Sequence, residues 1–222
     1  MSVVAGFAIV FIEALGAFWK RVHAINFGIY GASEVGKTTL HRQLQTRGEV
    51  PEIKKRTVGL ERPTRKLIKI DKDIHTVKVA DVGGESKYWE LWKRDMRKRQ
   101  PRYIIFMIDN RHLTSNVNMQ NQLAWQYLID LICDSYWRDG NKRKRKKDKD
   151  YPIAVGLWAN KFDLWGNGFE LDNMSNHPIF EPFAYGMQRL NEKGIPCFKY
   201  VVSAKSDPEM VYRGVMTMCD DY

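Results

Sequence analysis

The eight residues GASEVGKT at 31–38 place the strongest constraint on what this chain can fold into. They follow the strand-like run HAINFGIY at 23–30 and open a segment of helical character that begins at Lys37. The spacing fits G-x-x-x-x-G-K-[ST], in which Gly31 and Gly36 let the backbone curl so that successive N–H groups and the N-terminus of the helix face a phosphate group. The sequence therefore predicts a strand, a phosphate-binding loop and a helix in direct succession.

Strand-like and helix-like segments alternate along the rest of the chain. Strands are predicted at 23–30, 65–70, 74–80, 103–109, 153–159 and 197–202, and helices at 37–47, 88–99, 116–136, 183–192 and from Asp207 onward. The tight turn at 71–73 favours an antiparallel hairpin, whereas the helical connections elsewhere favour parallel pairing. The predicted fold class is therefore α/β: a P-loop NTPase with a mostly parallel six-stranded sheet flanked by helices and an N-terminal apolar helix. In such sheets, ligands bind beyond the carboxyl ends of the strands.

Length and composition fit a single soluble globular body. The chain has 222 residues, of which 44% are apolar and 12% aromatic, too many for a disordered chain. Its mean hydropathy of −0.47 excludes a polytopic membrane protein. The three cysteines, Cys133, Cys197 and Cys219, form no C-x-x-C pair, so we expect a reducing compartment and neither a disulfide framework nor a structural zinc site.

The N-terminal segment 3–19 is apolar with a single charge, and Lys20 and Arg21 come directly after it. As a helix it would reach about 25 Å, slightly short of the ~30 Å hydrocarbon core of a bilayer. It could therefore span a membrane, lie in the interface or be a buried helix of the core. The positive flank places the chain after Lys20 on the cytoplasmic face of the membrane. We predict a membrane-anchor or interfacial helix at 1–21 and a folded domain in the cytosol at 22–222.

The formal charge of +10 is concentrated in two segments. Residues 93–102 hold six cations and one anion, and residues 142–150 hold seven cations and two anions. Such runs attract anionic lipid or phosphate polymers, although a short run is most often a solvated loop. We predict a basic loop insertion at 141–150. Nucleic acid is the least favoured partner, because neither run is interleaved with aromatic residues.

Three further short motifs come directly after predicted strands. DVGG begins at Asp81, whose carboxylate can hold Mg²⁺, and its Gly84 N–H can donate to a γ-phosphate. NKFD ends at Asp163, which could accept hydrogen bonds from the N1 and N2 donors of guanine and would face an acceptor in adenine. SAK contains Ala204, whose N–H could donate to guanine O6. Together with the phosphate loop, these motifs predict a site for GTP or GDP with Mg²⁺.

On these motifs the chain resembles a small GTPase of the Ras superfamily over residues 24–205. The Arf-like branch is the most similar, because TVG at 57–59 resembles its switch I, and DVGG with Leu91-Trp92 after it resembles its switch II. The apolar N-terminus is also similar to that of the signal-recognition-particle receptor β subunit, which has a membrane segment there. Residues 141–150 and 164–180 have no obvious counterpart. The resemblance implies a switch in which the γ-phosphate and Mg²⁺ draw two loops inward.

The predicted site residues fall into groups by role. Nucleotide contacts are predicted for Gly31, Ala32, Ser33, Glu34, Val35, Gly36, Lys37, Thr38, Thr39, Thr57, Gly84, Asn160, Lys161, Asp163, Ser203, Ala204 and Lys205. The predicted Mg²⁺ ligands are Thr38, Thr57 and Asp81. The residues with predicted catalytic roles are Lys37, Thr57 and Glu85.

Departures from the family's pattern bear on hydrolysis. Glu85 stands where the family usually has a glutamine, and a carboxylate cannot donate to the γ-phosphate as an amide can. Ser33 and Glu34 put side chains in the phosphate loop, and no arginine is evidently placed in cis. We expect a membrane-associated switch that hydrolyses GTP slowly, with turnover assisted in trans; its exchange factor, GTPase-activating protein and effector are not indicated. The alternative is a scaffold or interaction module at a membrane that holds nucleotide without hydrolysing it.

Overall fold

A six-stranded sheet forms the centre of the protein in a computed structural model that describes residues 25–46, 64–70, 73–114, 119–134, 152–166 and 171–220. The strands are β1 (Ile25–Gly31), β2 (Thr64–Ile70), β3 (Asp73–Asp81), β4 (Tyr103–Ile108), β5 (Ala154–Ala159) and β6 (Cys197–Val201). Their order in the sheet is β2-β3-β1-β4-β5-β6. β2 pairs with β3 in antiparallel fashion, and every other pairing is parallel.

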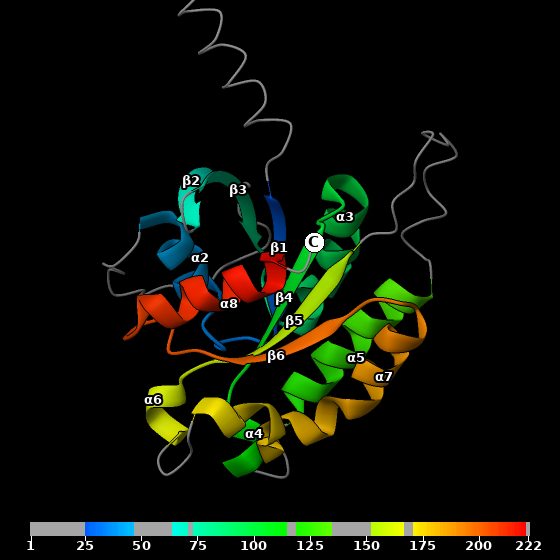
Figure 1. The fold of residues 1–222 in the computed structure, drawn as a ribbon. Coiled ribbons are helices and arrows are strands. Elements are labelled where there is room, and N and C mark those ends of the chain that lie inside the picture. Colours follow the sequence, from blue (N-terminus) through cyan, green and yellow to red (C-terminus); the bar gives the residue numbers. More distant parts are fainter. Residues whose placement is uncertain are drawn as a thin grey trace, which may run out of the picture.

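Helices cover both faces of the sheet (Figure 1). The α-helices are α2 (Lys37–Thr46), α3 (Trp89–Arg99), α4 (Arg111–Thr114), α5 (Gln120–Cys133), α6 (Phe162–Trp165), α7 (Ala184–Glu192) and α8 (Pro208–Asp220). Short 3₁₀ helices form at η1 (Ser86–Tyr88), η2 (Leu171–Asn176) and η3 (Pro178–Phe183). α2 and α8 pack together over one face, whereas α3, α5 and α7 lie over the other. The short helices α4 and α6 lie beyond one end of the sheet, at the bottom of Figure 1.

The core is centred on β4 and β5, which are buried along their whole lengths. Apolar runs without alternation are typical of parallel strands that are covered on both faces, and this explains why YIIFMI and AVGLWA form these strands. The largest fully buried side chains include Trp92 from α3 and Trp158 from β5. The predicted α/β fold with a mostly parallel sheet flanked by helices is confirmed.

A buried polar cluster fixes α3 against β1. The Tyr30 hydroxyl donates to Asp95 Oδ2 at 2.6 Å, and Arg99 donates to both carboxylate oxygens of Asp95, at 2.6 and 2.5 Å. Arg99 also donates to the Phe27 carbonyl at 2.8 Å, so it joins the end of the helix directly to the strand. The side chains of Asp95 and Arg99 are only 1% and 4% exposed. Burial, and next the charge of Asp95, raises the pKa of Tyr30 well above 10.0.

Several predictions lie outside the described residues. These are the apolar segment 3–19, the switch residue Thr57, the basic loop 141–150 and, within the region at 164–180 that lacks a counterpart, residues 167–170. Among the residues that the structure describes, no helix is both long enough and apolar enough to cross a membrane.

Candidate nucleotide-binding site

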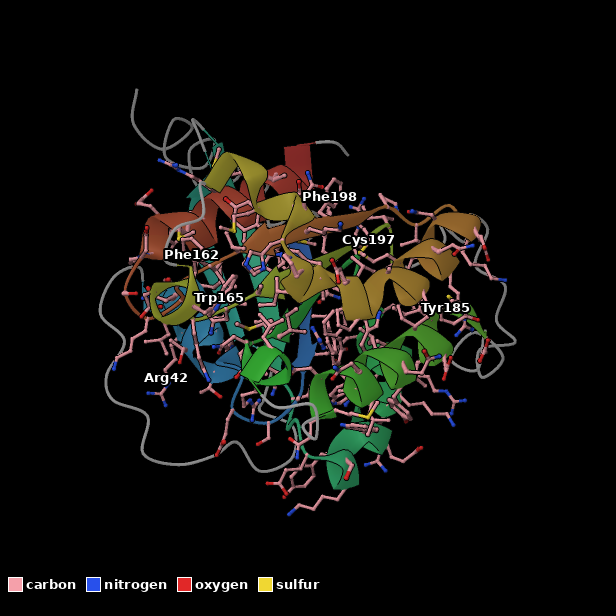
Figure 2. All side chains as sticks on the ribbon, turned by 90° about the horizontal axis from the view of Figure 1, so that it is seen from below. Arg42, Phe162, Trp165, Tyr185, Cys197 and Phe198 are labelled. Carbon is pink, nitrogen blue, oxygen red and sulfur yellow. The ribbon has the colours of Figure 1, made fainter. Side chains whose placement is uncertain are left out.

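The loops that carry the four motifs meet at the carboxyl end of the sheet. β1, β3, β5 and β6 run in the same direction, so the loops after them emerge at one edge. Figure 2 looks onto this edge, where Phe162 and Trp165 of α6 lie side by side with their ring centroids 5.2 Å apart. The topology thus brings together segments whose outermost residues, Gly31 and Lys205, are 174 positions apart in the sequence.

The phosphate loop depends on glycine at two positions. Gly31 has φ +142° and Gly36 has φ +97°, both disfavoured for residues with a side chain. A Cβ at Gly31 would also collide with the Met107 carbonyl oxygen, and one at Gly36 would collide with the side-chain amide of Asn160. The helix α2 begins at once, since the Leu40 N–H bonds the Gly36 carbonyl at 3.0 Å. A tight loop that leads into a helix N-terminus is the geometry that phosphate binding needs.

Lys37 lies across this loop. Its side chain is buried, with the residue only 6% exposed, and Nζ donates to the Ala32 carbonyl at 2.6 Å. Gly84 approaches the same place from the loop after β3, because a Cβ there would collide with the Ala32 backbone and Lys37 Nζ. The structure thus brings Lys37 and Gly84 together.

Two indole groups hold the loop at 83–84. Trp92 Nε1 donates to the Gly83 carbonyl at 3.0 Å, and Trp89 Nε1 donates to the Gly84 carbonyl at 3.2 Å. Both carbonyls therefore point toward α3, which fixes the orientation of the peptide groups beside the phosphate loop. In the sequence, Leu91-Trp92 is notable only because it resembles part of switch II of the Arf-like branch. The hydrogen bond from Trp92 to the Gly83 carbonyl gives Trp92 a physical role, which is to hold the loop at 83–84.

Asn160 joins the phosphate loop to the loop after β6. The side chain is 4% exposed; its Nδ2 donates to the Val35 carbonyl at 2.8 Å, and its Oδ1 accepts from the Ala204 N–H at 3.0 Å. The Asp163 N–H donates to Ser203 Oγ at 3.0 Å, so NKFD and SAK are linked a second time. The Asp163 side chain is exposed at this edge, as is Lys205. A base held between these loops would meet the Asp163 carboxylate.

Asp109 forms a charged cluster that the motifs do not reveal. The residue is fully buried; Oδ1 accepts from Arg111 Nε at 2.9 Å and Oδ2 from Lys161 Nζ at 2.9 Å. Burial alone would raise the pKa of Asp109, but the hydrogen bonds and charges of Arg111 and Lys161 outweigh it and hold this pKa below 3.8. One feature of the sequence could have indicated this cluster: an aspartate ends the apolar strand 103–109. A buried carboxylate requires a cationic partner, so a nearby arginine or lysine could have been expected.

A pocket of about 490 Å³ adjoins the phosphate loop on the side of α3. It is lined by Ser33, Glu34, Gly84, Glu85, Ser86, Trp89, Arg111, Gln120 and Leu123. Glu85, one of the three residues with predicted catalytic roles, is half-buried here and pairs with Lys87 at 2.7 Å. The pocket therefore places Glu85 next to the loop on which a terminal phosphate would lie.

The residues present fit a nucleoside phosphate with Mg²⁺. There is no room for a Cβ at Gly36 in the phosphate loop or at Gly84 in the loop after β3, and Lys37 is a buried cation beside both. Thr38 lies in the first turn of α2, and Asp81 ends β3 directly opposite Ile29 of β1. Within the described ranges, no group of three or more His, Cys, Asp or Glu residues could hold a metal ion. A magnesium ion here would instead take oxygen ligands from Thr38, Asp81 and the phosphates themselves.

A comparison with protein-family models gives a match over part of the chain. The family model for the Ras family matches residues 27–130, slightly less than half of the chain. No curated protein matches the chain. The matched range includes the phosphate loop and DVGG and stops before NKFD and SAK, so the match does not bear on the base-binding role predicted for these two loops. The parallel sheet flanked by helices is consistent with a P-loop fold of the Ras type. The match supports a small GTPase of the Ras superfamily, and with it a GTP-binding switch with GTPase activity in general.

Proposed function

We propose that this chain is a membrane-associated guanine-nucleotide switch that binds GTP with Mg²⁺ and hydrolyses it slowly to GDP. The observation that carries the proposal is the bridge made by Asn160, whose amide joins the phosphate loop at Val35 to the base loop at Ala204. One buried side chain thus joins the loop proposed to bind the phosphates to the loop proposed to bind the base. Together these loops form a site for a whole nucleotide.

Guanine is favoured by the polar groups at the base end. The Asp163 carboxylate is an acceptor pair for the N1 and N2 donors of guanine, and the Asp163 N–H donates to Ser203 Oγ at 3.0 Å, which joins this residue to the loop at 203–205. Adenine offers an acceptor where guanine has the N1 donor, so the same carboxylate would face an unpaired lone pair. The proposal therefore requires preference for GTP and GDP over ATP.

The direct test is nucleotide binding by the purified protein. After removal of co-purifying nucleotide with EDTA and phosphatase, titration calorimetry with Mg²⁺ should show binding of GDP and GTP and much weaker binding of ATP. Lys37→Ala should abolish binding, because it removes the buried cation of the phosphate loop. Equal affinity for ATP and GTP in the wild-type protein would contradict the guanine assignment.

The hydrolytic step centres on Glu85. Its carboxylate lines the pocket beside the phosphate loop, where it can accept a proton from an attacking water but cannot donate a hydrogen bond to a phosphate oxygen. This supports slow turnover that depends on a GTPase-activating partner. The second candidate function, a scaffold that holds nucleotide without hydrolysing it, is favoured by the same side chain. Phosphate release in a single turnover separates the two.

We base membrane association on the apolar sequence of 3–19. We also propose that the chain belongs to the Arf-like branch, which its motifs resemble. Lys20, Arg21 and the run at 142–149 would add attraction to anionic lipid of about 1 kcal/mol per cation near the surface. Deleting residues 1–19 should release the protein from sedimenting liposomes. Resistance to alkaline carbonate extraction indicates a spanning segment, and binding that is stronger with GTP than with GDP indicates an interfacial helix. A full-length protein that stays in the supernatant with either nucleotide would refute both forms of attachment.

A further inference from the structure

Arg111 connects the start of α4 to the phosphate loop. Its Nη2 donates to the Ser33 carbonyl at 2.5 Å, its Nε donates to Asp109 Oδ1 at 2.9 Å, and its Nη1 lies 3.9 Å from Glu34 Oε2. The residue is 78 positions away from Ser33 in the sequence, so no short motif could show this contact. One guanidinium thus meets two consecutive residues of the phosphate loop.

Asp109 fixes the direction in which Arg111 points. The guanidinium is planar and its donors have a fixed fork geometry, so a hydrogen bond through Nε sets the direction of both terminal nitrogens. Asp109 is itself held from the other side by Lys161 at 2.9 Å, and the Asn121 amide donates to its Oδ1 at 3.2 Å. Arg111 is therefore a rigid support for the loop, unlike a mobile surface cation.

Glu34 puts a negative charge in the phosphate loop, where it opposes the binding of an anionic ligand. It has φ +66°, and its side chain is 51% exposed on the rim of the pocket. A carboxylate at this place repels the phosphates of a nucleotide. Arg111 is a cation that the structure places against it, and the same guanidinium lines that pocket.

We propose that Arg111 is a positioning residue that fixes the Ser33 carbonyl of the phosphate loop and offsets the charge of Glu34, so that an acidic loop can bind nucleotide. The inference rests on the proposed function, because it assigns a role in guanine-nucleotide binding. It explains how the loop keeps Glu34 beside a ligand of the same charge. It also means that Asp109 supports both ends of the site, through Arg111 at the phosphates and Lys161 at the base.

The test is a double-mutant cycle on nucleotide affinity. The dissociation constants of fluorescent GDP and GTP are measured for the wild type, Arg111→Met, Glu34→Gln and the double variant. Arg111→Met should weaken binding by about tenfold, the size of one charge-assisted hydrogen bond. Adding Glu34→Gln to Arg111→Met should recover about threefold, whereas Glu34→Gln alone should change affinity by less than this, because its charge is already offset.

Further variants separate positioning from folding. Arg111→Lys keeps the charge and loses the fork, so it should lie between wild type and Arg111→Met and should remain measurable if Arg111→Met does not fold. Arg189→Met on α7 is the matched control: it removes an arginine that pairs with Asp130 and Asp134, and it should leave affinity unchanged.

The outcomes distinguish this inference from the proposed function. A wild type that binds no guanine nucleotide overturns both. A wild type that binds, together with Arg111→Met or Arg111→Lys variants of unaltered affinity, overturns the role of Arg111 alone. Recovery by Glu34→Gln in the Arg111→Met background supports charge compensation, since a merely structural loss would not be relieved by removing a second charge. Strict additivity of the two substitutions overturns it.

Discussion

Replacing Asn160 by alanine should separate the loops that form the two ends of the site. The side chain is 4% exposed and makes two hydrogen bonds, with the Val35 carbonyl at 2.8 Å and the Ala204 N–H at 3.0 Å. Asn160→Ala removes both hydrogen bonds at once and leaves a buried carbonyl and a buried N–H in need of water.

The expected magnitude is set by these two contacts. Each lost hydrogen bond costs about 1 kcal/mol, and a buried group left unpaired costs ~1–3 kcal/mol. Some water will enter the gap, so the free energy of unfolding should fall by about 2–4 kcal/mol, and the melting temperature by roughly 4–16 °C for a chain of this size. Nucleotide affinity should fall as well, because the phosphate loop loses its tie to the base loop.

Urea denaturation of the nucleotide-free protein measures the first effect, and calorimetry with GDP measures the second. The matched control is Gln188→Ala, which removes an amide from an exposed contact with Glu192 on α7 and should change stability by less than about 0.5 kcal/mol. Asn160→Asp keeps an oxygen acceptor for Ala204 but loses the donor to Val35. If Asn160→Ala unfolds like the wild type and binds GDP equally well, the two loops are not held by this side chain.

Three further outcomes are expected. Glu85→Gln should alter phosphate release in a single turnover while leaving GTP affinity nearly unchanged, and equal rates for the Glu, Gln and Ala forms would favour the scaffold. Asp163→Asn should weaken GTP binding by about 2–4 kcal/mol and shift preference toward xanthosine triphosphate, measured by competition binding. Because burial raises the pKa of Tyr30 above 10.0, the unfolded chain loses this proton first as pH rises, so stability should fall above about pH 10. Tyr30→Phe should weaken that decline in urea titrations at pH 7 and 10.5, at a cost of about 1 kcal/mol at neutral pH.

The fold and the motif loops are predictable from the sequence because both depend on local signals. Apolar runs such as 103–108 define buried strands, and strand direction then brings the loops after them to one edge. The cluster of Asp109, Arg111 and Lys161 escapes sequence reasoning for the opposite reason. Its members lie up to 52 positions apart in the sequence and meet only through the pairing of β4 with β5. Contacts between residues so far apart produce no periodic pattern of residue types in the sequence, so such patterns do not predict them.

The segment between α6 and α7 shows a second limit of local patterns. Residues 178–183 form a 3₁₀ helix in which Ile179, Phe180 and Phe183 are buried, although Pro182 interrupts any α-helical pattern. The side chain of His177 caps this helix by accepting from the Ile179 N–H at 3.1 Å. The Trp165 indole also packs against the His177 ring, with centroids 5.1 Å apart. Tertiary burial therefore determines the structure of a segment that has no obvious counterpart in the family's sequence pattern.

The buried polar cluster of Tyr30, Asp95 and Arg99 holds the last turn of α3 against β1, whereas the first turn has no part in this cluster. The first turn of α3 contacts the loop at 83–84 through Trp89 and Trp92, whereas Arg99 in the last turn donates to the Phe27 carbonyl of β1. The exposed cations Arg97 and Lys98 lie in the last turn, between Asp95 and Arg99. If the loop at 83–84 moves with the bound nucleotide, a partner that contacts the first turn of α3 would sense that movement, whereas a partner that contacts the last turn would bind equally with either nucleotide.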